Sequence, residues 1–200
     1  MANKLELLKK IRDEVWNLKN SPLYDERIKN KYYPVIGEGD HNAKIMFIGE
    51  APGKNEAQTG RPFCGASGKI LDELLNHIGI DRKAVYVTNI VKDRPPLNRD
   101  PNPEEIHLYA PFLDRQIEII QPKVIATLGR FSMAYIMKRL GLEKHLTSIS
   151  NMHGKIFDAD TSYGNIKIVP LYHPAVAVYN ADTKDILKKD FATLKTLTNL

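Results

Sequence analysis

The fold of this chain is indicated most clearly by the stretch KIMFIGEAPG, residues 44–53, in which an apolar run ends abruptly. Residues 45–48 are apolar and partly β-branched, which is typical of a short buried strand. Two glycines and a proline then stop the strand and turn the chain. Glu50 is left at the carboxyl end of the strand, the place where open α/β sheets bind their ligands.

The rest of the chain alternates between strand and helix patterns. Further strands are predicted at 84–91, 124–128 and 166–171, and helices at 3–17, 67–79, 104–120, 131–140 and 182–197. Ser67 and Gly79 are expected to cap the helix at 67–79, while residues 22–43 and 94–103 are expected to be irregular. This order predicts an α/β fold, a three-layer α/β/α sandwich with a central, mostly parallel four-stranded sheet, formed by residues 1–200 as a single domain.

The composition restricts the class of protein. A hydrophobic content of 42% in 200 residues supports a real core, and the net charge of +5 is only a mild preference for polyanions. Cys64 is the single cysteine, so an internal disulfide is excluded and an oxidising compartment is not expected. No apolar run approaches the ~20 residues that span a bilayer, and the N-terminus lacks a signal-peptide core. We expect an intracellular, cytoplasmic enzyme or binding domain without a membrane partner.

Polar side chains gather where the predicted strands end. Because parallel strands share one carboxyl edge, Glu50, Asn89 and His173 are expected to lie at the same edge. Each has a plainer interpretation alone: a solvated loop carboxylate, a turn-capping amide and a structural histidine. However, Asn89 interrupts an apolar strand, where a buried amide needs partners. Together the three predict a polar site for a small planar group.

The loop at residues 60–68 carries three glycines and a proline around Phe63. Phe63 is interpreted either as a core residue beneath the loop or as a platform on which a base stacks, and the residues alone leave both open. Other templates are absent: neither a dinucleotide-binding glycine motif nor a Walker A motif occurs. The six histidines form no pair with zinc-ligand spacing, and Cys64 is better explained as a small loop residue than as a nucleophile.

In order and spacing, a series of motifs resembles the family 4 uracil-DNA glycosylases. They are Gly49-Glu50-Ala51-Pro52-Gly53, Gly60-Arg61-Pro62-Phe63, Thr88-Asn89-Ile90-Val91-Lys92, Arg94-Pro95-Pro96 with Asn98-Arg99, Pro103-Glu104-Glu105, Leu128-Gly129 and His173-Pro174-Ala175. The resemblance covers roughly residues 5–197. It implies a single uracil-DNA glycosylase-like domain that repairs DNA.

The resemblance also implies a role for each matching site residue. Phe63 would stack under the flipped uracil, Asn89 would read the uracil edge, and His173 would face uracil O2. Glu50 matches the active-site carboxylate, and Glu56 the acidic residue beside the pyrimidine C5 atom. Ala51 is the small residue that the family carries in place of a water-activating aspartate. Residues expected to face DNA phosphates are Pro52, Gly53, Arg94, Arg99, Pro174 and Ala175.

One departure from the family is large. The family holds a 4Fe–4S cluster on four cysteines, but the corresponding positions here are Leu18, Ser21, Asp93 and Tyr109. Leucine and tyrosine cannot supply the thiolates that such a cluster needs. We therefore predict no metal cluster and no cofactor, and a divergent member of the family. If the fold is retained, the four residues should still lie near one another.

The function predicted from these residues is monofunctional hydrolysis of the N-glycosidic bond of deoxyuridine, in single- or double-stranded DNA and as a monomer, leaving an abasic site. The base must first be flipped out of the stack. Three alternatives remain: a glycosylase of the same fold for hypoxanthine or xanthine, a module that binds uracil-containing DNA without cutting it, and an unrelated nucleotide-metabolising enzyme. Release of free base from a panel of modified oligonucleotides distinguishes them.

Overall fold

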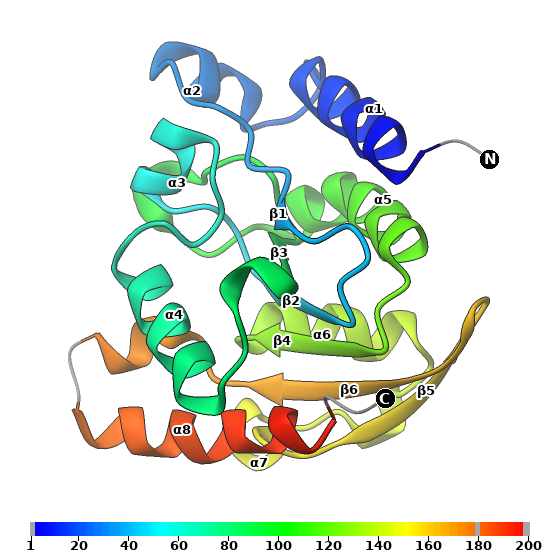
Figure 1. The fold of residues 1–200 in the computed structure, drawn as a ribbon. Coiled ribbons are helices and arrows are strands. Elements are labelled where there is room, and N and C mark those ends of the chain that lie inside the picture. Colours follow the sequence, from blue (N-terminus) through cyan, green and yellow to red (C-terminus); the bar gives the residue numbers. More distant parts are fainter. Residues whose placement is uncertain (1–2, 179–180, 198–200) are drawn as a thin grey trace.

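The computed structural model describes residues 3–178 and 181–197 (Figure 1). Within these residues a six-stranded sheet has the order β1-β3-β2-β4-β6-β5. Its four central strands run parallel, which confirms the predicted core of the sheet. They are β3 (Tyr86–Asn89), β2 (Ile45–Gly49), β4 (Val124–Leu128) and β6 (Gly164–Leu171).

The two outer strands are antiparallel and were not predicted. β1 (Glu38–Gly39) pairs with β3, and β5 (Phe157–Thr161) pairs with β6. β1 has only two residues, and in β5 only Ala159 is buried, so neither has the apolar run that signals a strand. The sheet is therefore mixed at its edges and parallel where the functional residues were expected.

The alternation of side chains along β2 explains the three layers. Met46 and Ile48 point to one face and join a core with helices α1 (Lys4–Trp16), α5 (Pro103–Ile120) and α6 (Arg130–Arg139). Ile45 and Phe47 point to the other face and pack with helices α4 (Ala66–Ile78) and α8 (Ala181–Thr196). Figure 1 shows these helices on the two sides of the sheet. A strand with apolar side chains on both faces is what a doubly covered sheet requires.

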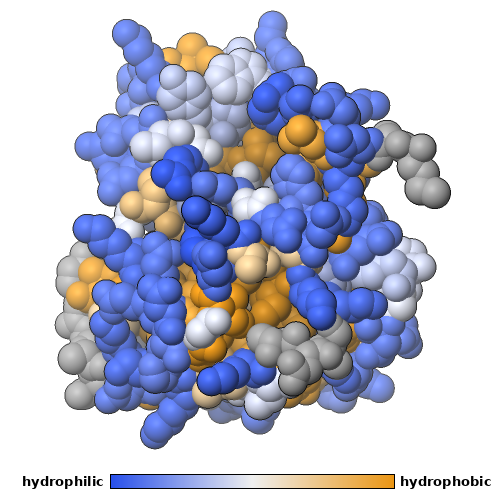
Figure 2. Space-filling model, viewed as in Figure 1, coloured by the Kyte–Doolittle hydropathy of each residue, from blue (hydrophilic) through white to orange (hydrophobic). Residues whose placement is uncertain are grey.

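The exterior is mostly hydrophilic on the face seen in Figure 2, with apolar residues showing mainly in the centre, above α8. Among the described residues, no helix is long and apolar enough to cross a bilayer.

The helix boundaries follow the sequence closely for the long helices and less well for the short segments. α4 is capped by Gly65, so the prediction of Ser67 as its N-cap is wrong, whereas Gly79 ends the helix with a φ of 76°. Gly79 suits that left-handed position because it has no Cβ. Short helices that the patterns did not predict are α2 (Tyr24–Lys29), α3 (Lys54–Thr59) and α7 (Ile149–Met152), with the 3-10 turns η1 (Arg82–Ala84), η2 (Pro96–Asn98), η3 (Glu143–His145) and η4 (Pro174–Ala177).

The positions where the family resemblance implies cysteines come together beside α1. Ser21 Oγ lies 2.7 Å from the Tyr109 hydroxyl, which donates a hydrogen bond of 2.5 Å to Asp93 Oδ2. Leu18 packs against the same core cluster as Tyr109. Because these groups carry no thiol and already bond to one another, they do not fit a 4Fe–4S cluster.

Asp93 also holds the N-terminal helices in place through Arg27 of α2. The Arg27 guanidinium lies 3.1 Å from Asp93 Oδ2 and donates to the main-chain oxygens of Val15 and Trp16 at the end of α1. The side chains are 4% and 1% exposed, so the ion pair is buried. Burial raises the pKa of Asp93, while Tyr109 and Arg27 act in the opposite direction. The partner of Asp93 is therefore a basic side chain from α2, together with a tyrosine hydroxyl.

Asp93→Asn is expected to lower the free energy of unfolding by about 3–5 kcal/mol, because it leaves the Arg27 charge buried without a counter-charge. Urea titration measures the change. Glu6→Gln is the matched control, since it removes one carboxylate of an exposed pair with Lys9 and should cost under about 1 kcal/mol. An Asp93→Asn variant as stable as the wild type would contradict a structural role for this ion pair.

Candidate active site

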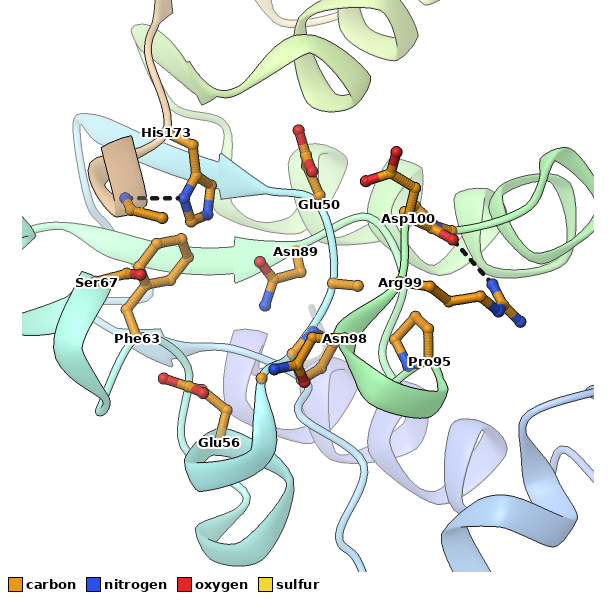
Figure 3. Close-up of a pocket in the computed structure, with 15 residues that line it drawn as sticks. Glu50, Glu56, Phe63, Ser67, Asn89, Pro95, Asn98, Arg99, Asp100 and His173 are labelled. Atoms are coloured by element: carbon orange, nitrogen blue, oxygen red, sulfur yellow. Dashed lines mark hydrogen bonds between the residues drawn. The ribbon is translucent and has the colours of Figure 1, made fainter. Parts of the chain in front are cut away.

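A cavity of about 320 Å³ opens at the carboxyl edge of the parallel strands (Figure 3). Its walls come from the loop after β2, the start of α3, the loop before α4, the end of β3, the proline-rich loop after it, and the turn after β6. The lining residues are Glu50, Ala51, Pro52, Gly53, Glu56, Phe63, Ser67, Asn89, Pro95, Asn98, Arg99, Asp100, Pro101, His173 and Ala175. The volume suits one small planar ring.

Asn89 lies at the centre of this group in Figure 3. It is the last residue of β3, is 2% exposed, and faces Gly49 in the parallel register of β2 and β3. A Cβ on Gly49 would collide with the Asn89 amide and with the Phe63 ring, so the glycine is what lets these two side chains approach each other. Within the described residues Asn89 Oδ1 is buried without a hydrogen-bond partner. A buried unpaired amide oxygen in a cavity is ready to accept a bond from a ligand.

The main chain of Asn89 is held from behind by a buried lysine. Lys92 Nζ donates to the Asn89 oxygen (2.6 Å), to Thr88 Oγ1 (2.8 Å) and to Gln116 Oε1 of α5 (2.6 Å). The Lys92 side chain is fully buried, and burial lowers its pKa well below the usual range. These bonds fix the end of β3 and thereby the position of the Asn89 side chain.

Phe63 is part of the core and also borders the cavity. It is 7% exposed and belongs to the core cluster beneath α4, and its ring also lines the cavity. Its backbone adopts a φ of 49°, which is unusual for a residue with a Cβ. The loop fits closely over α4, because a Cβ on Gly68 would overlap the Phe63 carbonyl. The ring centroid lies 5.6 Å from that of His173.

His173 is held in one orientation by its own turn. Its Nδ1 accepts a hydrogen bond from the Ala175 amide at 3.1 Å, so in the neutral ring the proton is on Nε2. Burial lowers the pKa of His173 to about 4, although the charge of Glu56 acts in the opposite direction. At neutral pH the ring is therefore an uncharged donor through Nε2.

Glu50 lies at the N-terminus of α6. Its Oε1 accepts a bond from the Phe131 amide at 3.4 Å, and a Cβ on Gly129 would collide with it. Burial raises the pKa of Glu50 above its usual range; the amide bond opposes this shift, and the nearby Asp100 adds to it. Partial positive charge at a helix N-terminus favours the ionised carboxylate there.

Glu56 fastens the Phe63 loop to α3. Its Oε1 accepts bonds from the amides of Cys64 (3.0 Å) and Gly65 (2.8 Å), and its side chain lines the cavity near Phe63 (Figure 3). The position that the family resemblance gives to an acidic residue is thus occupied by a carboxylate fixed through the backbone.

The residues predicted to meet DNA are divided between the cavity and its rim. Pro52, Gly53, Arg99 and Ala175 line the cavity, whereas Arg94 and Pro174 are not among its lining residues in the described part of the chain. Both arginines have internal partners. Arg99 forms two bonds with the buried Glu105, and Arg94 donates to Asn98 and to the Tyr32 hydroxyl.

Sequence reasoning missed part of the lining. Pro95, Asn98, Asp100 and Pro101 come from the stretch predicted only as a loop, and Ser67 was interpreted as a helix cap. The four prolines between residues 95 and 103 indicated a rigid loop, but not which side chains it turns toward the cavity. No group of three or more metal-ligating side chains occurs among the described residues.

The fold and this cavity define a three-layer α/β protein with a buried amide, an aromatic ring, a neutral histidine and a carboxylate around a ring-sized site. A sequence model of the uracil DNA glycosylase superfamily matches residues 36–195. The chain therefore belongs to the uracil-DNA glycosylase superfamily.

Several relatives match nearly the whole chain. A type-4 uracil-DNA glycosylase of Sulfurisphaera tokodaii is 44% identical over 96% of this chain and 86% of its own length. The type-4 enzyme of Saccharolobus solfataricus is 45% identical over 92% of this chain and 83% of its own length. The type-4 enzyme of Archaeoglobus fulgidus is 40% identical over 94% of this chain and 91% of its own length.

The two pKa shifts predict the pH dependence of any reaction that needs an ionised Glu50 and a neutral His173. As pH falls, Glu50 is protonated first, because its pKa is raised, whereas His173 stays neutral down to about pH 4. Single-turnover rates should therefore fall on the acid side through the pKa of Glu50.

Two variants test whether Glu50 is the group whose protonation causes this fall in rate at low pH, here called the acid limb. The Glu50→Gln variant should have a low single-turnover rate that no longer falls through the acid limb, because the titrating carboxyl group is gone. Asp100→Asn should move the limb to lower pH, because it removes a negative charge that raises the pKa of Glu50. A limb that persists unchanged in Glu50→Gln would assign it to another group.

Proposed function

We propose that this protein is a monofunctional uracil-DNA glycosylase, which flips uracil out of DNA and hydrolyses its N-glycosidic bond to leave an abasic site. The observation that carries the proposal is the buried, unpartnered amide oxygen of Asn89, between the Phe63 ring and the Glu50 carboxylate. The type-4 relatives support the same activity.

The Asn89 amide can recognise the base because it carries both a hydrogen-bond acceptor and a donor. Asn89 Oδ1 accepts a hydrogen bond from uracil N3–H, and Asn89 Nδ2 donates one to uracil O4. Cytosine presents the reverse pattern, with an acceptor at N3 and a donor at its amino group, so both amide groups would be left unpaired at a cost of about 1–3 kcal/mol each. Stacking on Phe63 offsets part of the cost of unstacking the base, by roughly 1–3 kcal/mol.

Bond cleavage requires charge stabilisation on both sides of the bond. The electron pair of the C1′–N1 bond leaves with uracil, and negative charge develops at O2, where His173 Nε2–H donates a hydrogen bond. A neutral histidine donor matches the lowered pKa of this residue. On the sugar side, positive charge develops at C1′. The ionised Glu50 either stabilises that charge or orients the water that adds to C1′. The proton that this water loses ends on the uracil anion, directly or by way of Glu50, so the products are neutral uracil and an abasic site.

The DNA backbone would lie across the rim of the cavity. We propose that Pro52, Gly53, Pro174 and Ala175 contact the phosphates beside the flipped nucleotide through their main chain, and that Arg94 and Arg99 add positive charge from the opposite loop. We also propose that the enzyme is a monomer and that it acts inside the cell, where its DNA substrate is.

The test is release of free base from oligonucleotides that contain a single uracil, hypoxanthine, xanthine or thymine. The wild type should release uracil and leave the other bases, and Asn89→Ala should lose most of the activity on uracil, by on the order of 100-fold, because both base-edge bonds disappear. An exposed substitution on α1, Lys9→Ala, serves as the control.

Each other outcome rejects part of the proposal. Binding without release of base would identify a non-cleaving module. Preferential release of hypoxanthine or xanthine would identify a glycosylase for another deaminated base. An Asn89→Ala variant as fast as the wild type would remove the assigned role of this amide.

We also propose that the protein works without an iron–sulfur cluster. The hydrogen-bonded group of Ser21, Tyr109, Asp93 and Arg27 occupies the corresponding place and offers no thiolate. The purified protein should lack the visible absorbance of a cluster, and prolonged incubation with an iron chelator should leave its uracil activity and its melting temperature unchanged. Visible iron–sulfur absorbance would overturn this part of the proposal.

A further inference from the structure

One apolar side chain at the cavity rim has an exposure that the fold does not explain. Leu97, in the η2 turn, is 92% exposed. Its neighbours Pro95 and Asn98 both line the cavity, on the side opposite Phe63 and His173 (Figure 3). A leucine held almost wholly in water gains nothing from burial within this chain, and beside a cavity it is free to contact a bound partner.

The backbone that presents Leu97 is strained. Leu97 and Asn98 adopt φ values of 56° each, two consecutive left-handed residues that both carry a Cβ. Asparagine tolerates this conformation, but leucine does so at a cost. Such outliers persist where the surrounding structure enforces them, and they gather at functional sites.

The surrounding contacts do enforce this turn. Arg94 Nε donates to Asn98 Oδ1 at 2.7 Å, and the Asn98 and Arg99 amides donate to the main-chain oxygens of Pro95 and Pro96, each at 3.1 Å. Arg99 is in turn anchored to the buried Glu105. The turn is thus a stiff support that holds one apolar side chain in solvent beside the cavity.

We propose that Leu97 is the residue that enters the DNA duplex when the base is flipped. Removing a base from the stack leaves an apolar gap between its neighbours, and an inserted leucine fills such a gap and prevents the base from returning. This inference rests on the proposed function. A rigid turn is an advantage here, because a turn that is already ordered loses little conformational entropy when its side chain inserts into the duplex.

A second apolar residue at the rim provides an internal comparison. Val176 in η4, next to the cavity-lining Ala175, is 39% exposed and lies on the His173 side. It is smaller and less exposed than Leu97, so the structure favours Leu97 as the inserted residue.

The experiment compares Leu97→Ala with the wild type on single-stranded and double-stranded oligonucleotides of the same sequence with one uracil, under single-turnover conditions. Leu97→Ala should lose on the order of tenfold in rate on the duplex and stay within about twofold on the single strand, where no stack must be opened. Leu97→Met should restore most of the duplex rate. Leu5→Ala, which truncates a 40% exposed leucine on α1, should leave both rates unchanged.

A binding readout separates this inference from the chemistry. With 2-aminopurine beside the uracil, the fluorescence rise on binding of the wild type reports the opened stack, and Leu97→Ala should reduce that rise. An equal loss of rate on both DNA forms would indicate a structural role for Leu97 and overturn the inference, as would unchanged duplex rate and fluorescence. A selective duplex loss in Val176→Ala but not in Leu97→Ala would assign insertion to η4. Absence of base release with normal fluorescence changes would contradict the proposed function instead.

Discussion

Two consecutive buried ionisable residues after β3, Lys92 and Asp93, connect the end of that strand to the helices around it. The Lys92 side-chain nitrogen ties the end of β3 to Gln116 of α5, and the Lys92 main-chain oxygen accepts a bond from the Val35 amide at 2.8 Å. The Asp93 carboxylate ties the same turn to Arg27 and, through it, to the end of α1. Buried polar groups are stable only when they are hydrogen-bonded, and these bonds restrain the conformation of the turn.

This restraint holds the end of β3, which brings Asn89 to the cavity. The Asn89 amide oxygen is left without a partner, at a cost of about 1–3 kcal/mol that a ligand can recover on binding. The Lys92 bond holds the main chain of Asn89, and the absence of a Cβ on Gly49 leaves the room that the amide occupies. In the proposed function, rigid support from behind the strand would make this unpaired oxygen available to a base edge.

The sequence predicted the parts of the site that depend on the sheet. Glu50, Asn89 and His173 converge because parallel strands share one carboxyl edge, and a short apolar run followed by glycine is enough to locate such an edge. The sequence did not predict the edge strands, of whose residues only Ala159 is buried, or the inward turn of Asn98. The η2 conformation depends on long side chains that bond across the loop, such as Arg94 to Asn98, and no local pattern records such contacts.

The network around Asp93 also connects to the proline-rich loop at residues 94–103, which is proposed to contact DNA. Asp93 belongs to the network beside α1, and Arg94, four residues before Asn98, bonds to the turn that presents Leu97. Adjacent residues of one chain therefore anchor the N-terminal helices and the rim of the cavity. A buried ion pair and a tyrosine hydroxyl thus hold the residue at which the loop starts, and the strained backbone of Leu97 and Asn98 lies within the same loop.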